Sequence, residues 1–239
     1  MTMATKPKIL VIDIETAPAV AYVWRLFDEN ISLEQLISPG RTICAAFKWY
    51  GEAGITFYSE WGDGPSAMFT GLRDAINEAD AVVTFNGDRF DLPKLTGEFV
   101  QWGLEPAAPV TSIDLYKVVK KLGLQSNKLA FVGPYLKVGD KLKHEGFELW
   151  SKVLDGDAAA QEKMQRYNKQ DVALTARVYK ALRPYMTTHP HISVDGECPN
   201  CGSDSVQNRG FRYTRTTKTQ RIQCTDCGAW SSGSRSKIK

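Results

Sequence analysis

Short apolar runs along the chain predict the strands of a buried sheet. Runs rich in β-branched and aromatic residues, bounded by turn residues, are typical of such strands. The first run is KILVIDI, two more follow around a glycine-containing turn, and the last two alternate with helical patterns. We predict strands at residues 8–14, 42–50, 55–59, 81–85 and 110–115.

Apolar residues at helical spacing separate and follow these runs. The strongest pattern covers residues 157–182, with Gly156 before it and Asp157 as the expected N-cap. Further helices are predicted at residues 65–78, 91–102, 116–122, 129–136 and 147–154. Three strands, then alternating helices and strands, then a helical block are typical of a mixed α/β domain, which we expect to span residues 1–185.

The chain changes character after this domain. Residues 186–197 (MTTHPHISVDGE) have the composition of a linker. Residues 198–239 carry eight basic and two acidic residues, whereas the rest of the chain carries 22 basic and 25 acidic ones. The net charge of +3 therefore hides a basic C-terminal segment, which favours a polyanionic partner, and an acidic body, which could bind cations.

Four of the five cysteines lie in the basic segment as two Cys-x-x-Cys pairs, Cys198 with Cys201 and Cys224 with Cys227. Two such pairs offer four thiolates, the closed tetrahedral set of a structural zinc site, and this spacing favours zinc over disulfides. A segment of this size has too little core to fold without the metal. We therefore predict a zinc ribbon at residues 198–239, with residues 231–239 as a frayed basic tail.

Basic, aromatic and threonine residues alternate between the two cysteine pairs. The pattern RGFRYTRTTKTQR predicts an exposed two-stranded ribbon that follows a phosphate backbone. Arg212, Arg215 and Lys218 are the candidate contacts. A ribbon that only stabilises the fold or binds a protein is the alternative.

Overall composition excludes two classes of protein. With 43% hydrophobic and 24% charged residues, the chain is not wholly disordered. No run approaches the roughly 20 apolar residues of a membrane span, and the N-terminus lacks a secretory pattern. We expect a soluble, cytoplasmic protein without membrane contact.

Two carboxylates end the first predicted strand. Asp13 and Glu15 are two residues apart, so both point to the same side of the strand. Like charges this close resist ionisation unless a cation compensates them, and carboxylate oxygens suit Mg²⁺ or Mn²⁺. A strand that simply turns polar at the surface would show the same pattern.

Two further motifs carry carboxylates. Asn86 and Asp91 belong to the loop NGDRFD, and Asp91 could equally be a helix N-cap. Tyr167 and Asp171 are four residues apart on the long helix and therefore share one face. A core tyrosine beside a surface aspartate is the alternative for this second pair.

Taken together, Asp-x-Glu, Asn-x3-Phe-Asp and Tyr-x3-Asp resemble the motifs of the DEDD exonuclease superfamily, which has an RNase H-like fold. The tyrosine four residues before the last aspartate is similar to the DEDDy subgroup; the other subgroup has a histidine five residues before it, where this chain has Arg166. The segment SNKLAFVGPYL with the later GDK is similar to proofreading domains of family-B DNA polymerases and their stand-alone relatives. The resemblance covers about residues 6–185.

This resemblance implies an active site that holds two Mg²⁺ or Mn²⁺ ions. Two cations about 3.5–4 Å apart can clamp the attacking and leaving oxygens of a phosphodiester. The implied ligands and catalytic residues are Asp13, Glu15, Asp91 and Asp171, with Tyr167 orienting the water because a phenol with a pKa near 10 is a poor base. Asn86, Phe90 and Trp24 are the implied or candidate contacts to the nucleic-acid strand.

The resulting expectation is a 3′→5′ exonuclease that releases nucleoside 5′-monophosphates, preferably from single-stranded DNA or DNA 3′ ends. A 3′→5′ exoribonuclease is the alternative with the same chemistry. A catalytically idle protein whose zinc ribbon binds nucleic acid or recruits a replication or repair partner is the alternative from another class. Phage or bacterial replication, recombination or repair is the expected setting.

Overall fold

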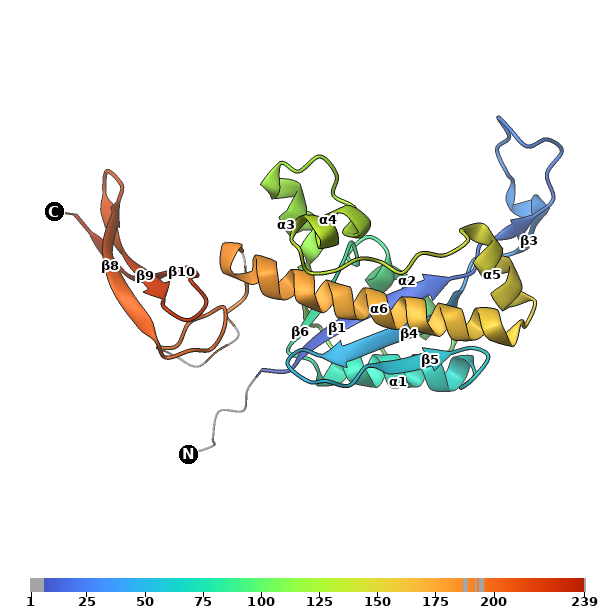
Figure 1. Ribbon diagram of the computed structural model, residues 1–239, viewed down its shortest axis with the longest axis horizontal. Helices are drawn as coiled ribbons and strands as arrows, with labels where there is room; N and C mark the ends of the chain where they lie inside the picture. Colours follow the sequence, from blue (N-terminus) through green and yellow to red (C-terminus); the bar gives the residue numbers. More distant parts are fainter. Residues whose placement is uncertain (1–6, 187–188, 192, 194–195, 239) are drawn as a thin grey trace.

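The protein is described here by a computed structural model covering residues 7–186, 189–191, 193 and 196–238. A five-stranded sheet with helices on both faces forms the first part, and a three-stranded sheet lies beyond it near the C-terminus (Figure 1). Five positions of the predicted linker, 187–188, 192 and 194–195, lie outside the described residues. None of the described helices is long and apolar enough to cross a membrane.

The larger sheet is mixed, with the order β5-β4-β1-β6-β7. Its central strand β1 (Ile9–Thr16) pairs antiparallel with β4 (Thr42–Trp49) and parallel with β6 (Ala81–Thr84). The outer strands are β5 (Thr56–Ser59) and β7 (Thr111–Asp114). All five predicted strands are confirmed, with ends that differ by one or two residues.

Alternation along β1 divides its side chains between two apolar cores. Ile9 and Val11 pack with residues of α6 (Ala158–Leu182), whereas Leu10 and Ile12 pack with α1 (Pro65–Glu78) and α2 (Asp91–Gln101) on the other face. Asp13 continues the series of Ile9 and Val11, so it faces α6. Figure 1 shows α6 lying across the sheet.

Shorter helices complete the α6 side of the sheet. These are α3 (Leu115–Val119), α4 (Leu129–Tyr135) and α5 (Phe147–Leu154). The helix predicted at residues 116–122 is an α-helix that tightens into a 3-10 turn over Lys120–Leu122 before Gly123, which has a left-handed backbone. Asp157 caps α6 as predicted, because its carboxylate accepts a hydrogen bond from the Ala160 N–H at 2.9 Å.

An arm between β1 and β4 was not predicted from the sequence. It contains β2 (Val20–Ala21), a 3-10 turn (Leu33–Gln35) and β3 (Leu36–Ser38), and it projects from the body (Figure 1). Strands of two and three residues leave no periodic signal. Trp24 lies on this arm with 93% of its surface exposed, and its backbone N–H is bonded to Glu29.

The C-terminal sheet corrects one expectation. Its strands are β8 (Val206–Tyr213), β9 (Thr217–Cys224) and β10 (Trp230–Lys237), in the order β10-β9-β8. The ribbon predicted between the cysteine pairs is confirmed by the antiparallel pairing of β8 with β9. The prediction of a frayed tail at residues 231–239 was wrong, because β10 pairs antiparallel with β9 as a third strand. Serine, glycine and lysine give β10 little strand propensity. The strand is stabilised instead by backbone hydrogen bonds to the unpaired edge of β9.

Residues after the long helix pack against the body. The His189 ring stacks on Tyr179 and its Nε2 lies 2.7 Å from the Tyr179 hydroxyl, while Nδ1 lies 2.7 Å from the Pro190 carbonyl. A neutral ring protonated on Nδ1 satisfies both bonds, and burial lowers the pKa of His189 to about 4. Asn200 donates to the Arg183 carbonyl at 2.8 Å, which ties the C-terminal segment to the end of α6.

Candidate functional site

Three carboxylates converge between β1 and α6. Asp13 and Glu15 extend from the same face of β1, and Asp171 comes from the middle of α6. One oxygen of each lies within 4.8 Å of the others. The two-residue spacing on a strand and the packing of α6 against β1 thus bring together groups that are more than 150 residues apart in sequence.

These carboxylates hold their protons more tightly than ordinary ones. Burial, and then the charge of Glu15, raises the pKa of Asp13 well above its usual value, and burial followed by the charge of Asp171 raises the pKa of Glu15 to about 8. Asp171 is 2% exposed, and its Oδ1 has no hydrogen-bond partner in the described part of the chain. Converging carboxylate oxygens with an unpartnered buried acceptor fit a hard divalent cation.

Lys141 contacts the carboxylate of Asp171. Its Nζ lies 2.7 Å from Asp171 Oδ2 and 5.0 Å from the centre of the Tyr167 ring. The Tyr167 ring is packed edge-on by His144 and Trp150, at 4.9 and 6.1 Å between ring centres. Burial, reinforced by Asp171, raises the pKa of Tyr167 above its usual value, so the phenol stays protonated at neutral pH.

Asp91 opens α2 and reaches the backbone of β1. Its Oδ1 accepts a hydrogen bond from the Ile14 N–H at 3.2 Å, and the residue is 4% exposed. Burial raises the pKa of Asp91 to about 7 although the Ile14 bond lowers it. The Asp91 carboxylate therefore lies next to β1, the strand that carries Asp13. It is not one of the three carboxylates whose oxygens lie within 4.8 Å of one another, which are those of Asp13, Glu15 and Asp171.

The loop before α2 contains a left-handed residue, Asn86, followed by a tightly packed glycine, Gly87. Asn86 has a left-handed backbone with φ 73°, and its N–H donates to Asp114 Oδ1 at 2.8 Å. A Cβ on Gly87 would lie about 2.4 Å from the buried Thr84 side chain. Only glycine fits there, and this close approach sets the start of α2 and hence the position of Asp91.

We expect Gly87→Ala to lower the free energy of unfolding by about 1–3 kcal/mol, because the added methyl group overpacks the loop against Thr84. Gly97→Ala is the matched control. Gly97 lies inside α2 with nothing within 4 Å of its added Cβ, so this change should increase stability by up to about 1 kcal/mol. Urea denaturation of both variants measures the difference, and equal stabilities would contradict the steric role of Gly87.

Sequence reasoning missed Asn168. This residue is fully buried, and its Nδ2 donates to the carboxylate and the backbone carbonyl of Asp13, at 2.7 and 3.2 Å. It thus fixes the orientation of the Asp13 side chain. Asn168 stands three residues before Asp171 and therefore shares its helix face, and this spacing could have indicated that Asn168 lies at the site.

The candidate strand contacts are distributed over three places. Asn86 and the 38%-exposed Phe90 lie on the loop that leads to Asp91, and Trp24 lies on the projecting arm. Arg212 and Lys218 are exposed on the C-terminal sheet, and Arg215 is exposed in the turn between β8 and β9. The structure brings the carboxylates and Tyr167 together but places the proposed contacts in separate regions.

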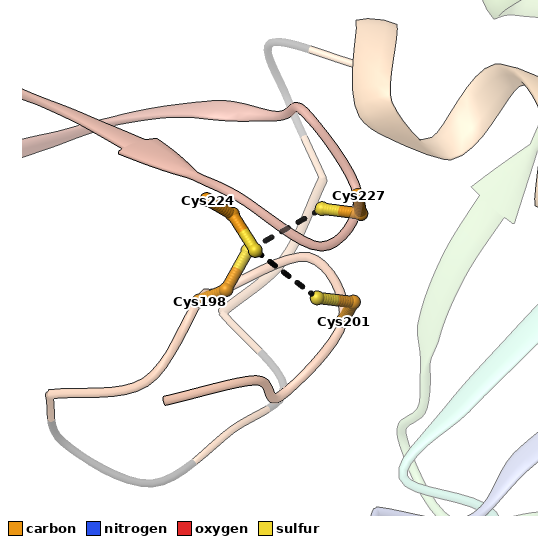
Figure 2. Close-up of side chains that lie close together, drawn as sticks. All are labelled: Cys198, Cys201, Cys224 and Cys227. Carbon is orange, nitrogen blue, oxygen red and sulfur yellow. Dashed lines mark hydrogen bonds between the residues drawn. The ribbon is translucent and has the colours of Figure 1, made fainter. Parts of the chain in front are cut away.

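The four cysteines form a second cluster at one end of the C-terminal sheet (Figure 2). Cys198 Sγ lies 3.7 Å from Cys227 Sγ, and Cys201 Sγ lies 3.6 Å from Cys224 Sγ. Although burial opposes it, hydrogen bonds from nearby backbone N–H groups lower the pKa of Cys224 to about 7. Four convergent thiols of this kind fit a tetrahedral zinc ion.

We expect Mg²⁺ to stabilise the protein more at about pH 8 than at about pH 6. The pKa of Glu15 is about 8 in the folded chain against an ordinary value of 4.5. Between pH 4.5 and pH 8 the folded state therefore binds more protons than the unfolded state. Stability without metal therefore falls as the pH rises toward 8. A cation binds the ionised carboxylates and reverses this loss, which melting curves with and without Mg²⁺ at both pH values measure. Equal melting shifts at both pH values would contradict this linkage.

Comparisons with known proteins give a family and a fold. The sequence model of a family described as the RNase_H superfamily matches residues 33–183, well over half of the chain, including Asp91, Tyr167 and Asp171. No curated protein matches the sequence. The family B DNA polymerase of the hyperthermophilic archaeon Pyrobaculum calidifontis matches in structure with a TM-score of 0.58 and 19% identity over 76% of this chain, which spans only 25% of that polymerase. The chain belongs to the RNase H superfamily.

Proposed function

We propose that the protein is a metal-dependent 3′→5′ exonuclease that shortens single-stranded DNA or DNA 3′ ends to nucleoside 5′-monophosphates. The convergence of Asp13, Glu15 and Asp171, with Tyr167 joined to Asp171 through Lys141, is the observation that carries the proposal. Membership of the RNase H superfamily supports nuclease activity in general. The fold shared with a DNA polymerase favours DNA over RNA as substrate.

In this proposal Asp13, Glu15 and Asp171 hold Mg²⁺ or Mn²⁺, and Asp91 completes a set for two ions. Bound cations supply Lewis-acid stabilisation of the phosphate oxygens and lower the pKa of water. Asn168 keeps the Asp13 carboxylate aimed at the site. The protonated Tyr167 donates a hydrogen bond that orients the attacking water and does not accept its proton.

The remaining assignments follow from the same proposal. Asn86 and Phe90 lie beside Asp91, where they can contact the last nucleotides of the strand, and Trp24 offers a stacking surface on the arm. We propose residues 1–185 as the catalytic domain, 186–197 as the linker and 198–239 as a zinc domain. Thiols kept reduced for zinc fit the cytoplasm of a bacterium or a phage-infected cell, where a replication or repair protein is the proposed partner.

The substrate class is tested with purified protein and 3′-labelled single-stranded and double-stranded DNA and RNA of one sequence, in Mg²⁺ or Mn²⁺. We expect release of labelled mononucleotide, fastest from single-stranded DNA. Faster release from RNA would replace the DNA assignment by the exoribonuclease. Binding of all four substrates without hydrolysis in either metal would favour the catalytically idle alternative.

A further inference from the structure

The C-terminal sheet has two chemically different faces, which its register defines. Residues that pair across antiparallel strands point to the same side, and so do residues two apart on one strand. Thr219 of β9 pairs with Arg212 of β8 and with Arg235 of β10. These three residues therefore share one face.

The same face carries two more basic residues and a tryptophan. Arg221 follows Thr219 by two positions, Lys237 pairs with Thr217, and Trp230 pairs with Gln223. Arg221 lies 4.8 Å from the centre of the Trp230 ring, which is 51% exposed. We call this surface the basic face, defined by Arg212, Arg221, Arg235, Lys237 and Trp230.

The opposite face is different. Tyr213 pairs with Lys218 and Phe211 pairs with Gln220, which places the two aromatic rings and a single lysine on that side. The Lys218 ammonium lies 5.2 Å from the centre of the Phe211 ring. Arg215 lies in the turn between β8 and β9.

No acidic residue occurs in the 24 residues of the three strands, so nothing on the sheet neutralises the basic face. Thr217 and Thr219 are each only 9% exposed on its central strand, where they pair with Lys237 and with Arg212 and Arg235. An uncompensated row of cations around a half-exposed indole complements a single strand, whose phosphates pair with cations and whose bases stack on aromatic rings.

We propose that the basic face holds the phosphate backbone of the single-stranded nucleic acid whose 3′ end is hydrolysed at the carboxylate site; this rests on the proposed function. The contacts are Arg212, Arg221, Arg235 and Lys237, with Trp230 stacking on a base. The assignment keeps Arg212 and removes Arg215 and Lys218 from the contacts inferred from the sequence.

The distance between the two sites makes this contact dependent on substrate length. Asp171 and Leu182 are eleven residues apart on α6, which corresponds to about 16 Å along the helix axis. The C-terminal segment is tied to the body just beyond that point, at Arg183. A trinucleotide in the carboxylate site is too short to reach the C-terminal sheet, whereas a strand of 30 nucleotides spans both.

Two double variants of the full-length protein test the proposal with equal loss of charge. R212Q with R235Q removes two cations from the basic face, and R215Q with K218Q removes two from outside it. Affinity for a 30-nucleotide DNA strand is measured against salt concentration in a background that also carries D13N, so that the strand is not consumed. Zinc content and melting temperature show whether each variant is folded.

We expect the first double variant to flatten the slope of log affinity against log salt by about 1.4 and to weaken binding roughly 20-fold at about 0.1 M salt. The second should change the slope by less than about 0.5. Trp230→Ala should weaken binding about tenfold with an unchanged slope, because stacking releases no counterions. Equal effects of the two double variants, or none, would overturn the assignment; no effect is also the outcome expected if the face binds an acidic protein.

A second readout separates this proposal from the proposed function. With Asp13 restored, both double variants should hydrolyse a trinucleotide at the wild-type rate, and only the first should slow on the 30-nucleotide strand. Failure of the wild type to hydrolyse either substrate would contradict the exonuclease and leave the binding comparison as the test of the basic face. Equal slowing on both lengths would contradict a contact remote from the carboxylate site.

Discussion

Replacing Asp13 by asparagine is expected to lower the rate of hydrolysis by at least about 10³-fold, because several kcal/mol of transition-state stabilisation depend on cations that this carboxylate helps to hold. Asp13 is the carboxylate that meets Glu15, Asp171 and the Asn168 amide. Initial rates on a labelled strand, wild type against variant, measure the effect.

The same variant should remain folded. Without metal, removal of a buried carboxylate that is repelled by Glu15 leaves the melting temperature unchanged or raises it. Asp88→Asn is the matched control: it makes the same chemical change on the loop before α2, where Asp88 pairs with Lys117 at the surface, and should keep the rate within about twofold. A D13N protein that retains the wild-type rate would show that the carboxylate cluster is not the active site.

Replacement of Cys224 by serine is expected to remove the zinc ion and unfold the C-terminal sheet while the body stays folded. Zinc sites of this kind contribute about 10–16 kcal/mol of binding free energy, which a sheet without an apolar core cannot replace. The buried apolar residues around the cysteines are few, and Ala229 is the only fully apolar one among the buried described residues of that cluster. Zinc content per chain and limited proteolysis beyond residue 186 measure the two effects.

Cys44→Ala is the control for this second prediction. Cys44 is buried in β4 and lies outside the cysteine cluster, so the variant should keep one zinc ion per chain. A wild-type protein without zinc, or a Cys224→Ser protein that keeps a full equivalent, would contradict the zinc assignment.

Local patterns predicted the parts of the fold that depend on local physics. The apolar run before Asp13 and the Asp157 cap of α6 have the expected roles. Gly202 and Gly228, each directly after a cysteine pair, have left-handed backbones with φ values of 72° and 76°, which glycine adopts readily. The spacing of Asp13 and Glu15 was enough to place both on one face. The Asp171 position on α6 followed from the helical period.

Long-range packing decided what the sequence could not show. Lys141 pairs with Asp171 because the segment before α5 runs back over α6, a contact that no local pattern shows. The Asn168 bond to Asp13 spans 155 residues. The β10 strand forms because it pairs with the unpaired edge of β9. The arm that carries Trp24 contains strands of two and three residues, which are too short to show an alternating pattern.

The central claim is that the carboxylate cluster removes nucleotides one at a time from a 3′ end. The most direct measurement follows a single DNA strand labelled at its 5′ end, in Mg²⁺, at single-nucleotide resolution, and identifies the released product. The account predicts a ladder of products that shorten by one nucleotide from the 3′ end, together with nucleoside 5′-monophosphates. Early internal cuts, release of the 5′ label as a mononucleotide, or products that carry a 3′-phosphate would contradict it.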